Sequence, residues 1–251
     1  SARTAARPRR DAGVDVLDTV DDGTMTTVAQ VKRAVQPLLQ RNADLALVGR
    51  LVLIKPVHHI LRGIFIDRSF DHDLFVPTWA VVFLFEPRCS FSYNWGERVY
   101  NRARGVWDVN DPEIPATLCE AIEEVVLPLL RPVKTIDDFV AFTTKERFRY
   151  TYLDFYELRK VFVDVARGDL AAARSICEFL ATDRARRKHL PRMQEEYDRI
   201  TKALCPCVAA GDRPGLVQLL RNWEAESARM LKLDRVWEPT PFPLELQRDP
   251  G

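Results

Sequence analysis

The chain has 251 residues, of which 47% are hydrophobic and 29% charged, and this is the composition of an ordinary folded protein with a sizeable core. Its 37 lysines and arginines almost cancel its 36 aspartates and glutamates, so the overall charge argues against nucleic acid or an anionic membrane as partner. No apolar run reaches the roughly 18 residues that a membrane-spanning helix needs.

Residues 1–24 contain an arginine-rich stretch and then an acidic one, without the apolar segment of a secretory signal. We expect a flexible leader or a cloning remnant here, with the fold beginning near Thr26. Thr27 and Gln30 then form the pattern of a capping box at the start of a helix. The apolar residues that recur on one face of this helix are Val28, Val31, Val35 and Leu38.

Four strand-like segments follow, at residues 47–54, 60–67, 78–85 and 89–93. The gaps between them are too short for crossover helices, so the sequence predicts an antiparallel meander. The third segment is apolar on both faces, which is typical of a central strand.

From residue 111 the apolar residues recur with a helical period, and a short internal repeat follows. The segment 165–169 returns as 208–212, and each copy contains a Gly-Asp pair between two helical stretches. Glycine suits the left-handed residue that ends one helix, and aspartate suits the cap of the next. The repeat therefore predicts two helical hairpins.

The predicted fold class is α+β: an N-terminal helix with a four-stranded antiparallel meander, followed by an all-helical C-terminal half of two helical hairpins. The predicted organisation is a leader over 1–24, an α+β domain over 25–145, a helical-hairpin region over 146–234 and an extended proline-rich tail over 235–251.

The five cysteines are odd in number and mostly far apart in the sequence. Three of them fall on apolar helical faces, where a free cysteine packs as a small hydrophobic side chain. Cys205 and Cys207 are separated by one residue, which is short for a zinc knuckle. We therefore expect free thiols in a reducing, cytoplasmic compartment.

The order of elements resembles that of a known family. A capped helix with Pro-Leu-Leu at 37–39, a meander, a helix ending at 125–130 and a short helix after Thr135 follow one another. This layout, over residues 26–143, resembles a large uncharacterised bacterial domain family with a Leu-Pro-x-Leu helix end, some of whose members are regarded as toxin-immunity proteins. The chain departs from the family pattern at 41–44, where the family has a Gly-Phe and a basic pair. The resemblance implies a bacterial protein and no catalytic residues.

One polar cluster has the composition of a metal site: His58, His59, Asp67, Asp71, His72 and Asp73. Imidazole and carboxylate suit zinc, manganese or iron, and such a site would support a metal-dependent hydrolase. If the strand turns back over the 71–73 loop, His59 and Asp67 meet that loop. The alternative is a solvated polar turn, because adjacent histidines on a strand point to opposite faces.

Residues 145–152 interleave basic and aromatic side chains, as single-strand nucleic-acid binders do. The alternative is that these residues pack at the junction between the two halves of the chain. Glycine-rich phosphate loops, the nucleophile elbow and the His-Glu-x-x-His motif are all missing from the sequence, so we expect no cofactor.

We predict a non-enzymatic protein that binds another protein, with neither membrane nor nucleic acid as partner. Aromatic residues and arginine dominate binding hot spots, and both occur in the polar segment after the meander. The candidate anchors are Trp95, Arg98, Tyr100, Arg102, Arg104 and Trp107. The alternative for the two tryptophans is that they fill the junction between sheet and helices.

Overall fold

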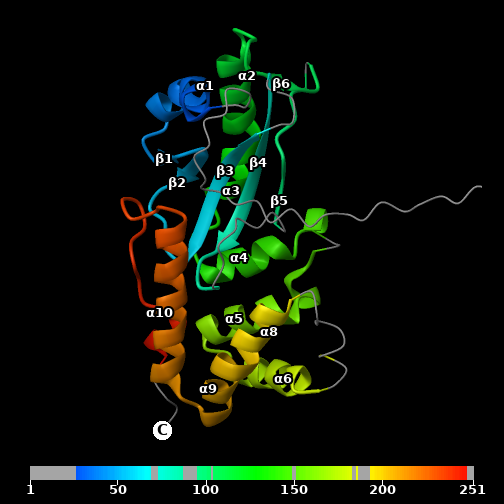
Figure 1. Ribbon diagram of the computed structural model, residues 1–251, viewed down its shortest axis with the longest axis vertical. Coiled ribbons are helices and arrows are strands. Elements are labelled where there is room, and N and C mark those ends of the chain that lie inside the picture. Colours follow the sequence, from blue (N-terminus) through cyan, green and yellow to red (C-terminus); the bar gives the residue numbers. More distant parts are fainter. Residues whose placement is uncertain are drawn as a thin grey trace, which may run out of the picture.

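The computed structural model describes residues 27–68, 73–86, 95–102, 104–148, 151–182, 185 and 193–247. It has an N-terminal helix, an antiparallel sheet and a mostly helical C-terminal half, which confirms the predicted α+β class. Figure 1 shows the sheet in the upper part, the helical hairpins below it and the long helix α10 beside both. The predicted leader and the predicted strand at 89–93 lie outside the described residues.

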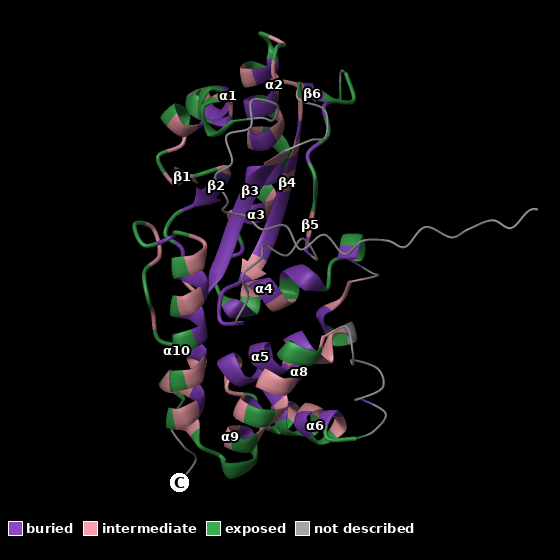
Figure 2. Ribbon diagram, viewed as in Figure 1, coloured by how far each residue is buried: buried purple, intermediate pink, exposed green. Residues whose placement is uncertain are grey.

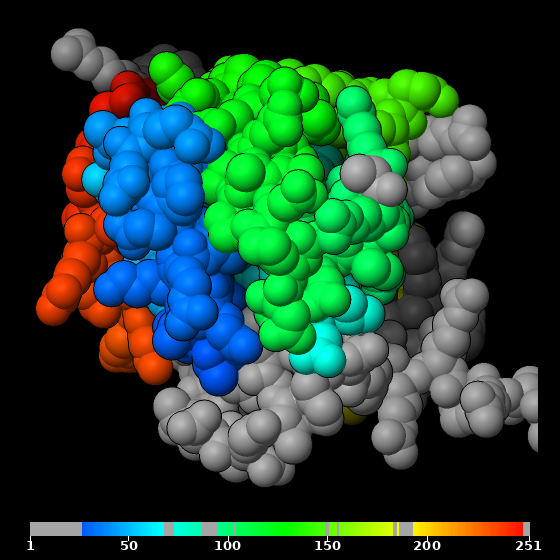
Figure 3. Space-filling view, turned by 90° about the horizontal axis from the view of Figure 1, so that it is seen from above, coloured from blue at the N-terminus to red at the C-terminus, as the bar shows by residue number. Residues whose placement is uncertain are grey.

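The first helix, α1 (Val28–Arg41), begins with the predicted capping box. The Thr27 hydroxyl accepts from the Gln30 N–H at 3.2 Å, and the Gln30 side chain accepts from the Thr27 N–H at 2.7 Å. Pro37 lies inside the helix without ending it, since the carbonyl that loses its donor belongs to the exposed Arg33. Figure 3 shows α1, in blue, beside the green surface that includes α2 (Ile114–Ala121).

The segment predicted as one strand over 47–54 is a hairpin instead. Strands β1 (Leu45–Val48) and β2 (Leu51–Ile54) pair around Gly49, whose φ of 58° lies in the left-handed region. The turn was hidden because the residues on both sides of it form an almost unbroken apolar run.

The long strands β3 (Ile60–Arg68) and β4 (Leu74–Phe83) form the centre of a sheet with the order β1-β2-β3-β4-β5. Two short strands, β5 (Gly96–Arg98) and β6 (Trp107–Asp108), both pair with β4. Figure 2 shows that β3 and β4 are buried along most of their length. The sheet is therefore covered on its central strands and short at the β5 end.

Strand β4 contains Pro77, although proline is normally excluded from central strands. The Val99 N–H donates to the Pro77 carbonyl at 2.8 Å, so the ring nitrogen of Pro77 also faces the β5 side. The Val99 carbonyl cannot receive a proton from Pro77 and accepts instead from the Trp107 indole at 2.7 Å. Trp107 thus supplies the donor that the proline removes from the ladder.

Most of the helices pack on one face of the sheet. That face contributes Val52, Ile64, Trp79 and Phe83 to a continuous core that extends into the helical hairpins. The other face carries a smaller apolar cluster with Leu53, Leu61 and Ala80. The C-terminal end of α10 (Arg213–Met230) covers this second cluster.

Within the described residues, two helices contain a π-helical turn, and each turn is followed by proline. The turn η1 (Ile122–Val126) precedes Pro128 of α3 (Leu127–Leu130), and η4 (Ile200–Leu204) precedes Pro206 of α9 (Cys205–Ala210). A proline cannot donate to the carbonyl four residues earlier. The residue before each proline bonds five residues back instead, to Ile122 and Ile200 respectively.

The predicted helical hairpins are present. The first consists of α5 (Glu157–Arg167) and α6 (Leu170–Leu180), and the second of α8 (Gln194–Arg199), η4 and α9 followed by α10. Gly168 and Gly211 have φ values of 83° and 67° at the helix ends. Asp169 and Asp212 accept from N–H groups of the following helices at 3.0 Å, so the repeated Gly-Asp pair acts as predicted.

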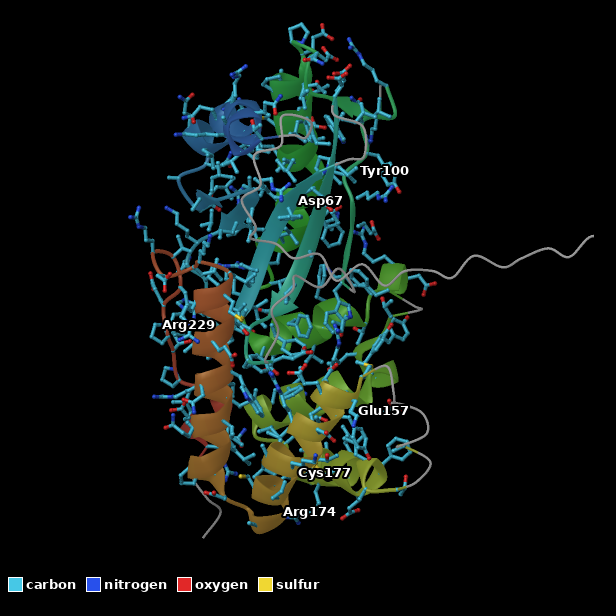
Figure 4. All side chains as sticks on the ribbon, in the orientation of Figure 1. Asp67, Tyr100, Glu157, Arg174, Cys177 and Arg229 are labelled. Atoms are coloured by element: carbon cyan, nitrogen blue, oxygen red, sulfur yellow. A yellow bond between two sulfur atoms is a disulfide. The ribbon has the colours of Figure 1, made fainter. Side chains whose placement is uncertain are left out.

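The cysteines differ from the prediction. Cys177 of α6 and Cys205 of α9 form a disulfide with a Cα–Cα distance of 5.5 Å, and Figure 4 labels Cys177 in the lower part of the molecule. Cys119 and Cys207 are free, and Cys89 lies outside the described residues. The expectation of a reducing compartment depended on free thiols, and the disulfide removes that basis.

The remaining elements connect these layers. They are α4 (Ile136–Thr143), the 3₁₀ turns Glu146–Phe148 and Leu153–Phe155, and α11 (Pro243–Leu246). The segment before α11 runs over the body, where Val57 pairs with Trp237 and the Phe242 side chain is fully buried. Among the described residues, no helix has the length and apolar character to cross a bilayer.

Candidate functional site

A groove lies between β5 with the loop that follows it and the helix formed by α2, η1 and α3. Its volume is about 390 Å³. We call it the β5 groove: residues 97–102 form its strand wall, and residues 117–129 contribute its helix wall. Trp79, Trp107 and Arg147 complete the lining.

The inner end of the β5 groove is apolar and its charges are neutralised. Trp79 and Trp107 are buried. The guanidinium of Arg147 lies 5.8 Å from the centre of the Trp79 ring and 4.0 Å from the carboxylate of Glu97. Two buried tryptophans therefore back this end of the groove, and the nearby charges of Arg147 and Glu97 lie opposite each other.

The outer rim is exposed and carries unpaired charge. Tyr100, beside the β5 end of the sheet in Figure 4, has an exposed fraction of 68%. Arg98 and Arg102 on the strand wall, and Glu120 and Glu124 on the helix wall, are also exposed. Within the described part of the chain, none of these four charged side chains has an ion-pair or hydrogen-bond partner. Each of them is free to meet a group from another molecule.

Neighbouring residues of the helix wall differ in what their side chains contact. Glu123 is held by Arg41 of α1 at 2.7 Å and by Asn42 at 2.7 Å, and the hydrogen bond from Arg41 lowers the pKa of the Glu123 carboxyl. Glu124 points into the groove lining instead. Val125, on the same π turn, leaves 39% of its surface exposed. The π turn thus carries one residue that fixes the helix and two that face the groove.

The predicted anchors separate into exposed and structural residues. Arg98, Tyr100 and Arg102 line the β5 groove as exposed side chains. Arg104 forms ion pairs with Asp111 and Glu113 outside it.

The two tryptophans are not surface anchors, and their interpretation as such was wrong. Trp95 is 1% exposed, its indole donates to the Thr151 carbonyl at 2.9 Å, and its ring centre lies 4.9 Å from that of Phe139. Trp107 is 4% exposed and bonds to Val99. Both fill the junction between sheet and helices, which was the stated alternative.

The proposed metal cluster does not assemble among the described residues. His59 precedes β3 and Asp67 lies near its far end, so the rise of a strand separates them by about 26 Å. Asp73 accepts from Asn110 at 2.7 Å, and Asp71 and His72 lie outside the described residues. In the described part of the chain, no three histidine, cysteine or acidic residues are placed to hold a metal ion.

At 145–148 the exposed Lys145 and Arg147 lie over the rings of Phe142 and Trp79, and Phe148 is buried. The Lys145 ammonium lies 4.9 Å from the centre of the Phe142 ring, and Phe148 is 3% exposed. Arg149 and Tyr150 lie outside the described residues. For the residues that are described, the packing alternative fits the geometry better than a nucleic-acid surface does.

Sequence reasoning missed a buried polar pair, His59 with Glu224 of α10. The His59 Nδ1 lies 3.0 Å from the Glu224 carboxylate, and its Nε2 lies 3.2 Å from the Thr240 hydroxyl. The imidazole also stacks on Phe242 at 4.1 Å. The partners are more than 160 residues away in the sequence, so no local pattern signals them. The contacts of the imidazole with Thr240 and Phe242 attach the C-terminal segment to the body, and its contact with Glu224 joins the start of β3 to α10.

Comparisons with protein-family models, curated proteins and solved structures found no match for this chain. No family model supports the likeness to a bacterial family over residues 26–143.

Proposed function

We propose that this chain is a protein-binding module and that the β5 groove is its binding surface. The observation that supports this proposal is the convergence of Arg98, Tyr100 and Arg102 on one groove, opposite the exposed Val125. Tyrosine and arginine supply most of the energy in many interfaces when they are desolvated by a partner. Here they surround an aromatic floor with a polar rim, which is the usual anatomy of a binding patch.

The charges of the groove favour a macromolecular partner over a small charged ligand. Its free charges are two arginines and two glutamates, so the rim has no net charge and attracts no simple anion or cation. A protein segment can present both signs at once, and such complementarity gives specificity.

The test is affinity capture by the full chain from a lysate of the organism that encodes it. Tyr100→Ala and Arg102→Glu alter only exposed side chains, so the stability of each variant should stay within about 0.5 kcal/mol of the parent. Leu246→Ala is the matched control, because Leu246 is an exposed apolar residue outside the groove, with an exposed fraction of 72%. We expect a partner that is retained by the parent and the control and lost by both groove variants. A partner retained equally by all four proteins would place the binding surface elsewhere.

A further inference from the structure

The strand wall of the β5 groove has an inner and an outer backbone edge. The Val81 N–H donates to the Trp95 carbonyl at 3.0 Å, and the Val99 N–H donates to the Pro77 carbonyl at 2.8 Å. Trp95 and Val99 therefore direct their backbone groups toward β4. In an antiparallel pair, backbone groups alternate between the two edges of a strand.

The backbone groups of Gly96, Arg98 and Tyr100 consequently face away from β4. The strand order ends at β5, and within the described residues no strand pairs with this outer edge. In Figure 1 β5 is the right-hand member of the sheet. An outer strand edge of this kind is a template for another extended chain.

The free charges lie on the two sides of this edge. Arg98 and Arg102 belong to the strand wall, and Glu120 and Glu124 to the helix wall, with Val125 exposed on the same wall. A segment in the groove would therefore meet positive charge on one side, negative charge on the other and an apolar contact on the helix wall. This arrangement is complementary to an extended segment that carries an acidic, an apolar and a basic residue.

We propose that the occupant of the β5 groove is an extended segment of another protein, which joins the sheet as an added strand beside β5. Its acidic side chain meets Arg98 or Arg102, and its basic side chain meets Glu120 or Glu124. This inference rests on the proposed function and adds the mode of binding. Strand addition gains affinity from main-chain hydrogen bonds and specificity from alternate side chains.

A helical occupant fits the geometry less well. A helix with its side chains is about 10–12 Å across and leaves no backbone group for a strand edge. The three residues of β5 limit the added ladder to a short one. Because few main-chain bonds are available, the charges on the rim must supply the selectivity.

The experiment uses a phage-displayed library of random peptides of about twelve residues, selected against the full chain. A selected peptide is then synthesised with single backbone N-methyl groups along its length. N-methylation removes one donor, and a tenfold loss of affinity corresponds to about 1.4 kcal/mol. We expect losses of about tenfold or more at every second residue of the pairing segment and small losses between them.

The chain itself supplies a second readout through hydrogen exchange of its amides. The amides of Arg98 and Tyr100 should exchange about tenfold more slowly in the complex, because they gain acceptors. The amide of Val99 is bonded to Pro77 already and serves as the internal control. Glu124→Lys should weaken binding of a peptide whose basic residue is required, and Glu178→Lys, at an exposed position of α6, should leave it unchanged.

The outcomes separate the mode of binding from the function. If Tyr100→Ala abolishes peptide binding but N-methylation shows no alternation, the β5 groove binds partners and the added strand is refuted. If the selected peptides bind Tyr100→Ala, Arg102→Glu and Glu124→Lys as well as the parent, both the added strand and the proposed function are refuted. A peptide-free dimer that dissociates on Arg102→Glu would identify a second copy of this chain as the occupant and overturn the inference.

Discussion

Replacing Trp107 by phenylalanine tests whether its indole compensates for Pro77 in the sheet. The substitution keeps an aromatic ring but removes the donor to the Val99 carbonyl, at present 2.7 Å from the indole nitrogen. Leaving a buried carbonyl without a donor costs about 1–3 kcal/mol. Adding the smaller loss of packing, we expect Trp107→Phe to lower the free energy of unfolding by about 2–4 kcal/mol.

The cost should depend on the residue at position 77. Pro77→Ala restores an N–H that faces Val99, because the carbonyl of residue 77 already accepts from Val99. In that background the Val99 carbonyl keeps a donor when the indole is lost. The double variant should therefore be more stable than additivity predicts, by about 1–2 kcal/mol.

The free energies of unfolding of the parent, the two single variants and the double variant are measured by urea unfolding. Far-ultraviolet circular dichroism follows the transition, so the measurement does not depend on tryptophan fluorescence. Trp95→Phe combined with Pro77→Ala is the matched control, since the Trp95 indole bonds to Thr151 and not to the ladder. The effects of Trp95→Phe and Pro77→Ala on the free energy of unfolding should add to within about 0.5 kcal/mol. If Trp107→Phe and Pro77→Ala are equally additive, the indole does not replace the missing donor and the explanation of the proline in β4 fails.

Three further outcomes follow from the structure. Trp95→Ala should cost about 3–5 kcal/mol in urea unfolding, because the side chain is 1% exposed; a change below 1 kcal/mol would contradict its place in the core. Gly168→Ala should destabilise slightly more than Gly211→Ala: both residues have positive φ, but a Cβ at 168 would displace the exposed Gln247 side chain from its contact with the Arg167 carbonyl, to which it donates at 2.8 Å, and one at 211 has nothing within 4 Å. Equal thermal shifts would refute that contact. The pKa of Asp44 is lowered by its hydrogen bond from Arg131, so its stabilising effect is present at neutral pH and lost as the pH falls through the folded-state pKa. The difference in urea midpoint between the parent and Asp44→Asn should therefore shrink below about pH 4, and a constant difference would contradict the assignment.

The features that the sequence predicted correctly depend on neighbouring residues. The capping box at Thr27 joins residues three apart, and the Gly-Asp pairs at 168–169 and 211–212 act within one turn of each helix. The hairpin at Gly49 was missed because apolar residues on both sides concealed the turn. The strand predicted at 78–85 is β4 (Leu74–Phe83), which begins four residues earlier and includes Pro77. The donor that makes Pro77 acceptable in β4 comes from Trp107, thirty residues later, so no local pattern indicates it.

The groove could be predicted only in part, because its two walls come from distant segments. Arg98, Tyr100 and Arg102 of the strand wall were predicted as anchors from their composition, but residues 117–129 gave no such signal. Glu120 and Glu124 look like ordinary charges on a helix face. Their significance depends on the position of β5, which long-range pairing with β4 determines.

Some of the residues predicted as anchors hold the rim segment in place, and others are presented by it. Trp107 fixes the rim segment at Val99, and Arg104 fixes it to Asp111. Tyr100 and Arg102 lie between these attachments and remain exposed. Composition alone cannot separate the side chains that hold a loop from those that the loop presents, because both kinds are aromatic or cationic. If the rim is held in this way, Trp107→Phe should weaken partner binding by loosening the rim as well as by altering the groove lining, and restoring the ladder with Pro77→Ala should recover the part of the loss that comes from the rim. Tyr100→Ala should show no such recovery, since it removes a contact rather than a support.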